Sequence, residues 1–142
     1  MTMAVNHFGP FYLTSLLFPN IKNSKEARII NLSSEASRHT SLATADDIAG
    51  EHFESLGYYS KSKLANVQFT VGLAERLTKY PHIKVMCLHP GIVDSEFAVR
   101  TPFCSLLGIF KCMCCCLYVD TQQGARTSLF LSRENFANLR SG

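Results

Sequence analysis

Several features that would assign this chain of 142 residues to a specialised class of protein are missing from it. The N-terminus has no positively charged segment and no cleavage pattern, so we expect no signal peptide. The net charge of +3 is small, and no basic stripe with interleaved aromatic residues occurs, which argues against nucleic acid as a partner. There is no internal repeat or low-complexity linker. With 46% hydrophobic and 18% charged residues, the chain is typical of one globular domain.

The six cysteines lack the pattern of a disulfide framework and that of a metal site. Four of them crowd into positions 112–116, which is a poor arrangement for disulfides and indicates a reducing compartment. Adjacent cysteines cannot easily share one tetrahedral zinc ion, and no Cys-x-x-Cys pair with a second pair follows, so we expect no metal. S-acylation near a membrane and plain pocket-lining or surface cysteines are the interpretations left for this cluster.

A tyrosine and a lysine four positions apart, Tyr59 and Lys63, stand at the start of a helix predicted over residues 58–80. Positions i and i+4 share a helix face, so the phenol and the ammonium point into the same space. A free phenol has a pKa of about 10, and a nearby lysine cation lowers that pKa. The pair could then move a proton to or from an alcohol or carbonyl oxygen. Alone, the spacing arises easily by chance and is usually explained by two solvated side chains.

The hydrophobic pattern around this pair predicts an α/β unit. Residues 27–34 and 83–88 are short, almost continuously apolar runs, typical of parallel strands buried on both faces. A polar loop over residues 35–57 and the helix over 58–80 separate them, so the two strands should be parallel through a right-handed crossover. Pro81 ends the helix. Its expected buried stripe consists of Leu64, Val67, Val71, Ala74 and Leu77.

A further helix is predicted over residues 1–21, before a polar turn from Pro19 to Lys25. Pro10 has no N–H for the carbonyl of Asn6, so we expect a kink. Either the helix merely bends there, or the freed carbonyl holds a water. The apolar residues of this helix recur at a period close to 3.6, at Val5, Phe8, Tyr12, Leu13, Leu16 and Leu17.

The pattern weakens over residues 92–119. Residues 103–119 are apolar except for one lysine and a little short for a transmembrane helix. An amphipathic lid, a wall of a pocket for a hydrophobic substrate and an interfacial segment all fit this stretch. A final helix is expected over residues 121–133, with Asp120 or Thr121 as its N-cap.

Four stretches, in this order, resemble motifs of the short-chain dehydrogenase/reductase superfamily, and most closely those of its retinol dehydrogenase-like branch. They are Val5-Asn6-His7-Phe8-Gly9, Ile30-Asn31-Leu32-Ser33-Ser34, Tyr59-Ser60-Lys61-Ser62-Lys63-Leu64-Ala65-Asn66 and His89-Pro90-Gly91-Ile92-Val93-Asp94-Ser95. The long gap between the second and third stretches also fits that branch. The later stretches Gln123-Gly124-Ala125 and Leu139-Arg140-Ser141-Gly142 resemble its late helix and the start of its last strand. The resemblance covers nearly the whole chain.

This resemblance implies an α/β fold with a partial Rossmann-like, doubly wound parallel sheet. Residues 1–142 would form a single partial domain, the C-terminal catalytic half of the fold, with a variable apolar substrate loop over residues 96–119. The implied catalytic residues are Asn6, Ser34, Tyr59 and Lys63. The implied cofactor-binding residues are Tyr59, Lys63, Pro90, Gly91, Ile92, Val93 and Ser95, with Ser95 in place of a more usual threonine.

The implied reaction is hydride transfer between a nicotinamide cofactor, NADP(H) rather than NAD(H), and a small hydrophobic alcohol or aldehyde. A retinoid, a sterol or a fatty aldehyde would suit the apolar loop. Tyr59 would give the proton to the substrate oxygen, and Ser34 would hydrogen-bond that oxygen. Lys63 would lower the tyrosine pKa and bind the ribose hydroxyls. The main-chain carbonyl of Asn6 would hold a water leading to Lys63, and Pro10 fits that role.

The glycine-rich turn that in this family places the pyrophosphate at a helix N-terminus does not occur among the 142 residues. We therefore expect a fragment, a truncated gene model or a short isoform, and no binding of NADPH by these residues alone. Two functions stay open: an oxidoreductase active only in a longer chain, and an inactive product that acts as an interaction module. An in-frame glycine-rich segment upstream of Met1 in the encoding DNA would favour the enzyme.

The resemblance also bears on partners and location. In this family the helices that correspond to residues 1–21 and 58–80 commonly form a subunit interface, so a homodimer through them is expected. Residues 103–119 offer a peripheral membrane contact. The implied location is the cytoplasmic side, in association with the endoplasmic reticulum membrane.

Overall fold

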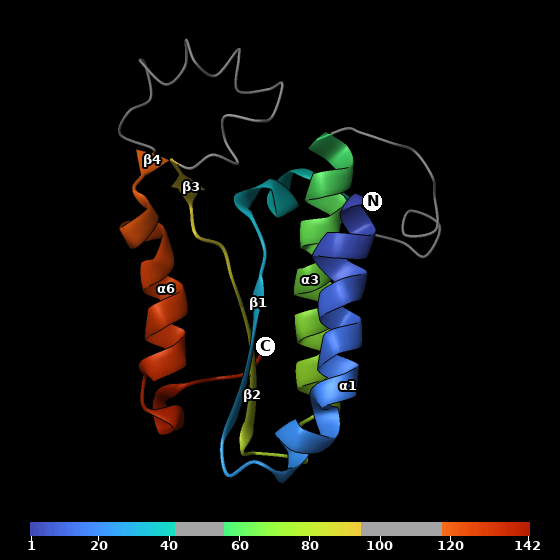
Figure 1. Cartoon of the computed structure of the whole chain (residues 1–142), viewed down its shortest axis with the longest axis vertical. Coiled ribbons are helices and arrows are strands. Elements are labelled where there is room, and N and C mark those ends of the chain that lie inside the picture. Colours follow the sequence, from blue (N-terminus) through green and yellow to red (C-terminus); the bar gives the residue numbers. More distant parts are fainter. Residues whose placement is uncertain (42–55, 95–117) are drawn as a thin grey trace.

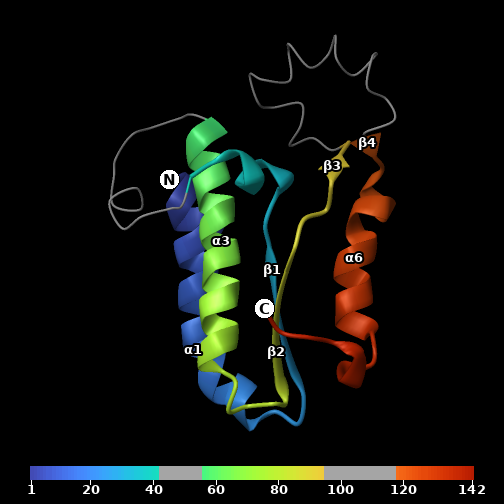
Figure 2. The same cartoon turned by 180° about the vertical axis from the view of Figure 1, so that it is seen from behind.

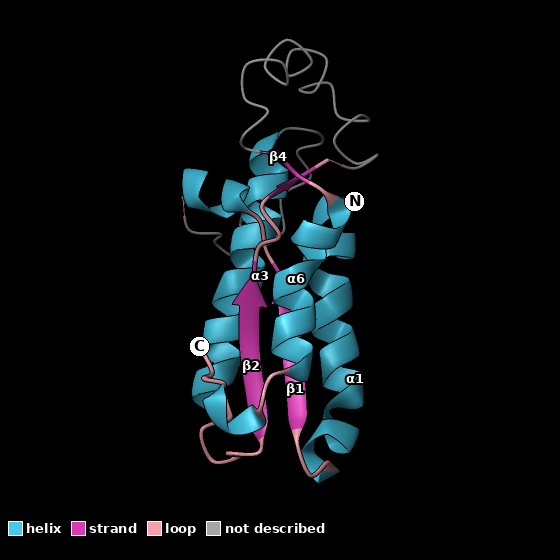
Figure 3. Cartoon of the chain, turned by 90° about the vertical axis from the view of Figure 1, so that its left-hand side faces the viewer, coloured by secondary structure: helices cyan, strands magenta, loops and turns pink. Residues whose placement is uncertain are grey.

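The structure, a computed structural model, describes residues 1–41, 56–94 and 118–142. Helices α1 (Gly9–Asn23) and α3 (Leu56–Arg76) lie side by side on one face of a small sheet, and α6 (Thr121–Arg133) covers the opposite face (Figures 1 and 2). Figure 3 looks onto α6 with the strands behind it. Three layers of this kind are the α/β arrangement that the sequence predicts.

The sheet pairs β1 (Ala27–Leu32) with β2 (Ile83–Leu88). The strands are parallel, as predicted, and their register places Ala27 opposite Ile83 and Leu32 opposite Leu88. The first strand ends two residues earlier than its apolar run predicts, because the chain turns at the two serines that follow Leu32. The sheet therefore brings the carboxyl ends of both strands to one end of the molecule (Figure 1).

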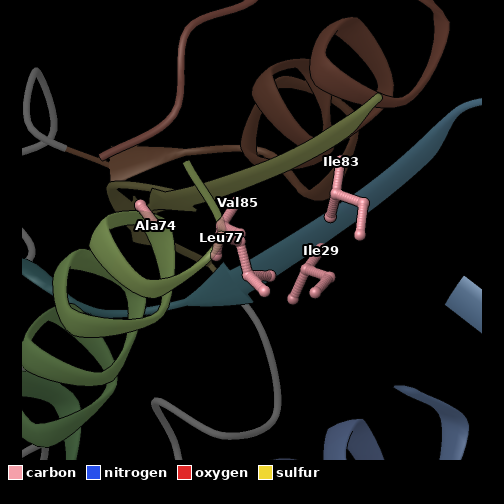
Figure 4. Close-up of a cluster of buried hydrophobic side chains, with 5 residues drawn as sticks. All are labelled: Ile29, Ala74, Leu77, Ile83 and Val85. Carbon is pink, nitrogen blue, oxygen red and sulfur yellow. The ribbon is translucent and has the colours of Figure 1, made fainter. Parts of the chain in front are cut away.

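An apolar core lies between α3 and the two strands (Figure 4). It consists of Ile29, Ala74, Leu77, Ile83 and Val85, and Val85 is completely buried. Burying side chains of this kind contributes roughly 1.5–3 kcal/mol for each large residue. This core fixes the C-terminal half of α3 against the sheet.

The predicted buried stripe of α3 is correct only at Ala74 and Leu77. Val71 is 43% exposed, and Leu64 and Val67 are half-buried. Closer to the start of the helix, the buried positions are occupied mainly by small and polar side chains, which find hydrogen-bond partners on neighbouring segments. These positions are Ser60, Ser62, Ala65, Asn66 and Thr70.

The first helix begins with a π-helical turn, η1 (Ala4–Phe8), and continues without interruption as α1 to Asn23. The N–H of Gly9 bonds the carbonyl of Ala4, five residues back, just before Pro10. A local widening of this kind is a known way for a helix to accommodate a disturbed hydrogen-bond ladder. The predicted kink therefore takes the form of a π turn.

The predicted turn from Pro19 to Lys25 is wrong for its first half, because α1 includes Pro19 and ends at Asn23. A proline near the end of a helix removes only one hydrogen bond, and the helix tolerates that loss here. The apolar residues of the predicted stripe do not enter a core, since no residue of α1 is buried. Exposed fractions range from 43% at Phe8 to 65% at Tyr12 and Val5.

The ends of the other helices are set by local chemistry. The α3 helix ends at Arg76, four residues before the predicted end, and Leu77 shares its N–H between the carbonyls of Leu73 and Ala74. The α6 helix has the predicted bounds. Its N-cap is Asp120, whose Oδ1 accepts a hydrogen bond of 2.6 Å from the N–H of Gln123.

A short parallel pair, β3 (Ile92–Val93) with β4 (Tyr118–Val119), was not predicted. The chain end lies along β2, where Ser141 Oγ accepts from the N–H of Val85 at 3.1 Å and the N–H of Gly142 donates to the Val85 carbonyl at 3.1 Å. Before it, the 3-10 turn η4 (Phe136–Asn138) packs near the sheet. The contacts of residues 141 and 142 fit the expectation that a strand starts here.

Helix α6 packs against β3 through Gly124. A Cβ atom added to Gly124 would lie 2.6 Å from Cγ2 of Val93, whereas one added to Gly72 on α3 would meet nothing within 4 Å. We expect Gly124→Ala to lower the free energy of unfolding by about 1–3 kcal/mol, because the extra methyl overpacks this contact. Gly72→Ala should instead raise it by about 0.5–1 kcal/mol, since alanine is the better helix former. Urea unfolding of both variants tests this, and equal effects would contradict the packing argument.

Candidate active site

Tyr59 and Lys63 lie in the first two turns of α3, at the same end of the molecule as the carboxyl ends of β1 and β2 (Figure 1). The Nζ atom of Lys63 lies 5.7 Å from the centroid of the Tyr59 ring. It also donates a long hydrogen bond of 3.4 Å to the carbonyl of Leu32, the last residue of β1. The two side chains share the space that their i, i+4 spacing predicts.

Burial governs the ionisation of Lys63. The half-buried ammonium is partly desolvated, which lowers the pKa of Lys63 from its ordinary value of 10.5. The thiol group of Cys87 on β2 opposes this shift when it is ionised. Burial raises the pKa of Cys87 from 9.0, and the hydroxyl of Thr70 and the charge of Lys63 act in the opposite direction. A thiol beside the lysine was not predicted. Cys87 lies on β2, and it comes close to Lys63 only because β2 packs against α3.

The two serines after β1 have different surroundings. Ser33 is buried, its Oγ donates a hydrogen bond of 2.8 Å to the carbonyl of Lys63, and its N–H donates to the Leu88 carbonyl at 2.7 Å. Ser34 is half-buried and caps the 3-10 helix η2 (Glu35–His39) by accepting from the N–H of Ala36 at 3.3 Å. Ser33 therefore joins the end of β1 to α3, while Ser34 is the serine at the rim of the candidate site.

Asn6 on η1 reaches the same helix. Its Nδ2 donates a hydrogen bond of 3.1 Å to Ser62 Oγ, and its main-chain carbonyl accepts one of 2.9 Å from Nδ2 of Asn66. Neither interpretation of the carbonyl freed by Pro10 included this partner. A carbonyl oxygen has two lone pairs, so the contact with Asn66 leaves capacity for a second donor.

The predicted cofactor-binding turn follows β2. Gly91 has a positive φ of 82°, a backbone conformation that glycine adopts without strain. His89 Nε2 lies 3.3 Å from Oε2 of Glu35, so this contact links the turn to the one that carries Ser34. In open α/β sheets, ligands bind at the carboxyl ends of the strands, and both turns lie there.

The described residues fit the nicotinamide-ribose end of a dinucleotide. Lys63 offers ammonium N–H groups and Tyr59 a hydroxyl at this end of the sheet, and both groups suit a ribose diol. Pro90, Gly91, Ile92 and Val93 would border the nicotinamide. The candidate residue Ser95, positions 96–117 of the expected substrate loop, most of the expected membrane contact over 103–119, and the Cys112–Cys116 cluster lie outside the described residues, whereas Tyr118 and Val119 form β4.

Metal-binding groups and membrane-spanning helices are both absent from the parts of the chain that the structure describes. In residues 1–41, 56–94 and 118–142, no three His, Cys, Asp or Glu side chains gather in a way that could hold a metal ion. Within these same ranges, no helix has the length and apolarity needed to cross a membrane.

The positions that pattern reasoning missed are Ser33, Cys87, His7 and Asn66. One signal was present in the sequence for the last of them. Ser62, Asn66 and Thr70 recur every four residues in a helix that is otherwise largely apolar on that side, and such a recurrence predicts a buried polar face. His7 and Cys87 carry no comparable signal, because their partners come from distant segments.

Lys63 and Cys87 make the stability depend on alkaline pH in opposite directions. The lowered pKa of Lys63 means that, between its folded value and 10.5, the unfolded chain binds more protons, so the free energy of unfolding rises with pH. The raised pKa of Cys87 means that above 9.0 the folded chain binds more protons, so stability falls. In Cys87→Ala we expect the free energy of unfolding to rise with pH toward 10.5 without the opposing fall. Urea unfolding at several alkaline pH values measures this.

The lysine is tested in the same background. Lys63→Met combined with Cys87→Ala should remove the rise toward pH 10.5, whereas Lys79→Met, which removes an exposed lysine beyond the end of α3, should keep it. A rise that persists without Lys63 would show that another group causes it.

Comparison with known proteins places this geometry in a family. A family profile described as short chain dehydrogenase matches residues 1–102. The chain is 43% identical over 130 residues to retinol dehydrogenase 12 of Bos taurus, covering 89% of this chain and 39% of that protein. It is 37% identical over 145 residues to retinol dehydrogenase 11 of Homo sapiens, covering 100% of this chain and 43% of that protein. The chain thus spans about two fifths of the length of these curated relatives.

Solved structures agree on the fold. A crystal structure of an uncharacterized protein from Mycobacterium paratuberculosis superposes with a TM-score of 0.64 at 27% identity, over 94% of this chain and 41% of that one. A protein from Burkholderia xenovorans, described as a short-chain dehydrogenase/reductase, gives 0.57 at 23% identity, over 95% of this chain and 48% of that one, and supports the fold alone. The expected partial Rossmann-like α/β fold is confirmed. The chain belongs to the short-chain dehydrogenase family.

Proposed function

We propose that this chain is the catalytic part of an NADP(H)-dependent oxidoreductase that interconverts an alcohol and a carbonyl on a hydrophobic substrate. The observation that carries the proposal is the position of Lys63, half-buried between the Tyr59 ring and the end of β1. An ammonium in a partly desolvated place acts more strongly on a neighbouring phenol than it would in water. Family membership supports a nicotinamide cofactor.

The bound cofactor supplies or accepts the hydride. In the reductive direction, the hydroxyl of Tyr59 gives its proton to the substrate oxygen, and the charge of Lys63 stabilises the phenolate that remains. The hydroxyl of Ser34 donates a hydrogen bond to the same oxygen and fixes its position. The Asn6 carbonyl, which faces α3 through Asn66, accepts from a water that returns a proton toward Lys63.

The proposed substrate is a retinoid or a similar long-chain aldehyde or alcohol. The support comes from the relatives, which are named retinol dehydrogenases 11 and 12, and from the apolar composition of residues 96–119. NADP(H) in preference to NAD(H), and a place at the cytoplasmic side of the endoplasmic reticulum membrane, belong to the same proposal and rest on resemblance to the retinol dehydrogenase-like branch.

A second candidate function is association through α1 and α3, with or without catalysis. A groove of about 630 Å³ runs between these helices, and Phe11, Phe18, Phe69 and Leu73 are among its lining residues. Beside it, the apolar side chains of α1 are exposed, including Leu16 at 58%. We propose that a second copy of this chain covers this face, since an uncovered apolar surface of this kind marks an interaction site.

The catalytic proposal is tested in a chimera that joins Met1 to the part of Bos taurus retinol dehydrogenase 12 that this chain does not match. We expect the chimera to reduce all-trans-retinal with NADPH, followed by loss of NADPH absorbance. Tyr59→Phe should lower kcat by about 10²–10⁴-fold, because it removes the proton donor. Tyr58→Phe is the matched control, since Tyr58 packs against Met3 and Ala65. Near-normal turnover of Tyr59→Phe would refute the assigned role.

The association is tested with the 142-residue chain in the ultracentrifuge. Phe11→Glu on α1 should convert a dimer to a monomer, because it places a charge in the groove between the helices. Leu129→Glu on α6 is the control, since Leu129 is 46% exposed and Phe11 is 45% exposed. A wild-type chain that sediments as a monomer, or a Leu129→Glu variant that dissociates equally, would contradict an interface on α1 and α3.

A further inference from the structure

A row of buried polar side chains lies on α3 beside the candidate site. Ser62, Asn66 and Thr70 are 0%, 5% and 1% exposed, and they follow one another at intervals of four residues. Buried polar groups of this kind are costly unless they are hydrogen-bonded. The middle residue of the row, Asn66, makes the contacts that reach furthest, because they connect α3 with two other segments.

The side-chain amide of Asn66 connects three segments of the chain. Its Nδ2 donates to the main-chain carbonyl of Asn6 on η1 at 2.9 Å and to that of Leu32 at the end of β1 at 3.0 Å. Its Oδ1 lies 3.0 Å from Nδ1 of His7, which is 9% exposed. Both N–H groups of the amide and its oxygen therefore have partners, and every partner lies outside α3.

The orientation of the amide follows from chemistry. Carbonyl oxygens only accept, so the atom of Asn66 that faces the carbonyls of Asn6 and Leu32 must be the nitrogen. The oxygen then faces His7, and Nδ1 of His7 must carry a proton in order to donate to it. A proton on Nδ1 of His7 thereby adds a third contact that favours the orientation the two carbonyls require.

The contact with Leu32 links this amide to the catalytic lysine. The carbonyl of Leu32 accepts from Asn66 Nδ2 at 3.0 Å and from Lys63 Nζ at 3.4 Å. The shorter of the two bonds comes from the asparagine, which is also the more buried and better-fixed side chain. The position of the Leu32 carbonyl, and with it the lone pair that it offers to Lys63 Nζ, therefore depends on Asn66.

We propose that Asn66 is a positioning residue of the active site, which holds the carbonyls of Leu32 and Asn6 in place beside Lys63, and that His7 fixes its amide orientation. The inference deepens the proposed function and rests on it for its catalytic consequence. The other titratable groups near Lys63 are Tyr59 on the same helix and Cys87 on β2.

Nuclear magnetic resonance of the 142-residue chain tests the positioning without any assay of activity. Leucine has about the size of asparagine but no side-chain N–H donors. In Asn66→Leu, Lys63 is therefore the remaining side-chain donor to the Leu32 carbonyl. We expect the titration midpoint of the Lys63 ¹³Cε signal to rise by about one pH unit, the size of one hydrogen bond to a charged group. The imidazole ¹⁵N signals of His7 should show a proton on Nδ1 in the wild type and lose this preference in Asn66→Leu.

Thr70→Val is the matched control for the loss of a buried hydrogen bond. Thr70 is the next residue of the row and accepts from Nδ2 of Asn31 at 2.8 Å, but its side chain contacts neither carbonyl. Because the Thr70 hydroxyl also acts on the thiol of Cys87, this control and Asn66→Leu are both measured in the Cys87→Ala background. We expect Thr70→Val to unfold more easily there while the Lys63 midpoint stays that of Cys87→Ala. A midpoint that moves equally in both variants, or one unchanged in Asn66→Leu, overturns the proposal.

His7 provides a second route if Asn66→Leu does not fold. His7→Leu removes the donor that orients the amide, and His7→Asn supplies an amide N–H near the place of the Nδ1 proton. We expect the Lys63 midpoint to rise in His7→Leu and to return toward the wild-type value in His7→Asn. Equal midpoints in these two variants overturn the role of His7.

The chimera separates this inference from the proposed function. If the chimera reduces retinal, Asn66→Leu should lower kcat by roughly 10²-fold with little change of KM, because small misplacements of catalytic groups have effects of that size. Unchanged kcat together with an unchanged Lys63 midpoint overturns the positioning while the function stands. A shifted midpoint in a chain whose chimera shows no turnover overturns the function while the positioning stands.

Discussion

The hydrogen bonds made by one buried amide, that of Asn66, join the first half of helix α3 to η1 and to the end of β1. Helix α3 carries Tyr59 and Lys63, while Ser34 follows β1 and Asn6 belongs to η1. Apolar packing of Met3 with Tyr58 and Ala65 joins the start of α3 to the chain just before η1. The amide joins α3 to both η1 and β1, with one nitrogen between two carbonyls and one oxygen against an imidazole. The relative places of four candidate catalytic residues therefore depend on directional contacts.

The opposite end of α3 is held differently. There Ala74 and Leu77 pack with Ile29, Ile83 and Val85 in a core that stabilises without specifying angles closely. In this helix, apolar burial holds one end strongly. Hydrogen bonds hold the other end in a defined position and orientation. The polar end costs stability whenever one partner is lost, because the remaining groups are left buried and unpaired. The geometry of the candidate site thus depends on every buried polar group keeping its hydrogen-bond partner.

Much of this arrangement could be predicted from local pattern. Strand positions, the bounds of α6 and the common face of Tyr59 and Lys63 follow from periodicity and spacing, which need no knowledge of distant segments. The outward direction of the α1 apolar residues and the polar row on α3 could not be predicted, because an apolar or polar side chain is buried only if another segment covers it. The thiol of Cys87 comes beside Lys63 through strand register alone.

The pairing of His7 with Asn66 also constrains how this sequence can change over evolutionary time. Each residue satisfies the other, and they are 59 positions apart in the chain. A drift at position 7 toward a residue without a donor would release the amide, and a drift at position 66 would leave an imidazole proton with no acceptor. Position 7 can therefore change alone only to a residue that keeps a donor, and a change that removes the donor requires a change at position 66, so the two codons are expected to covary.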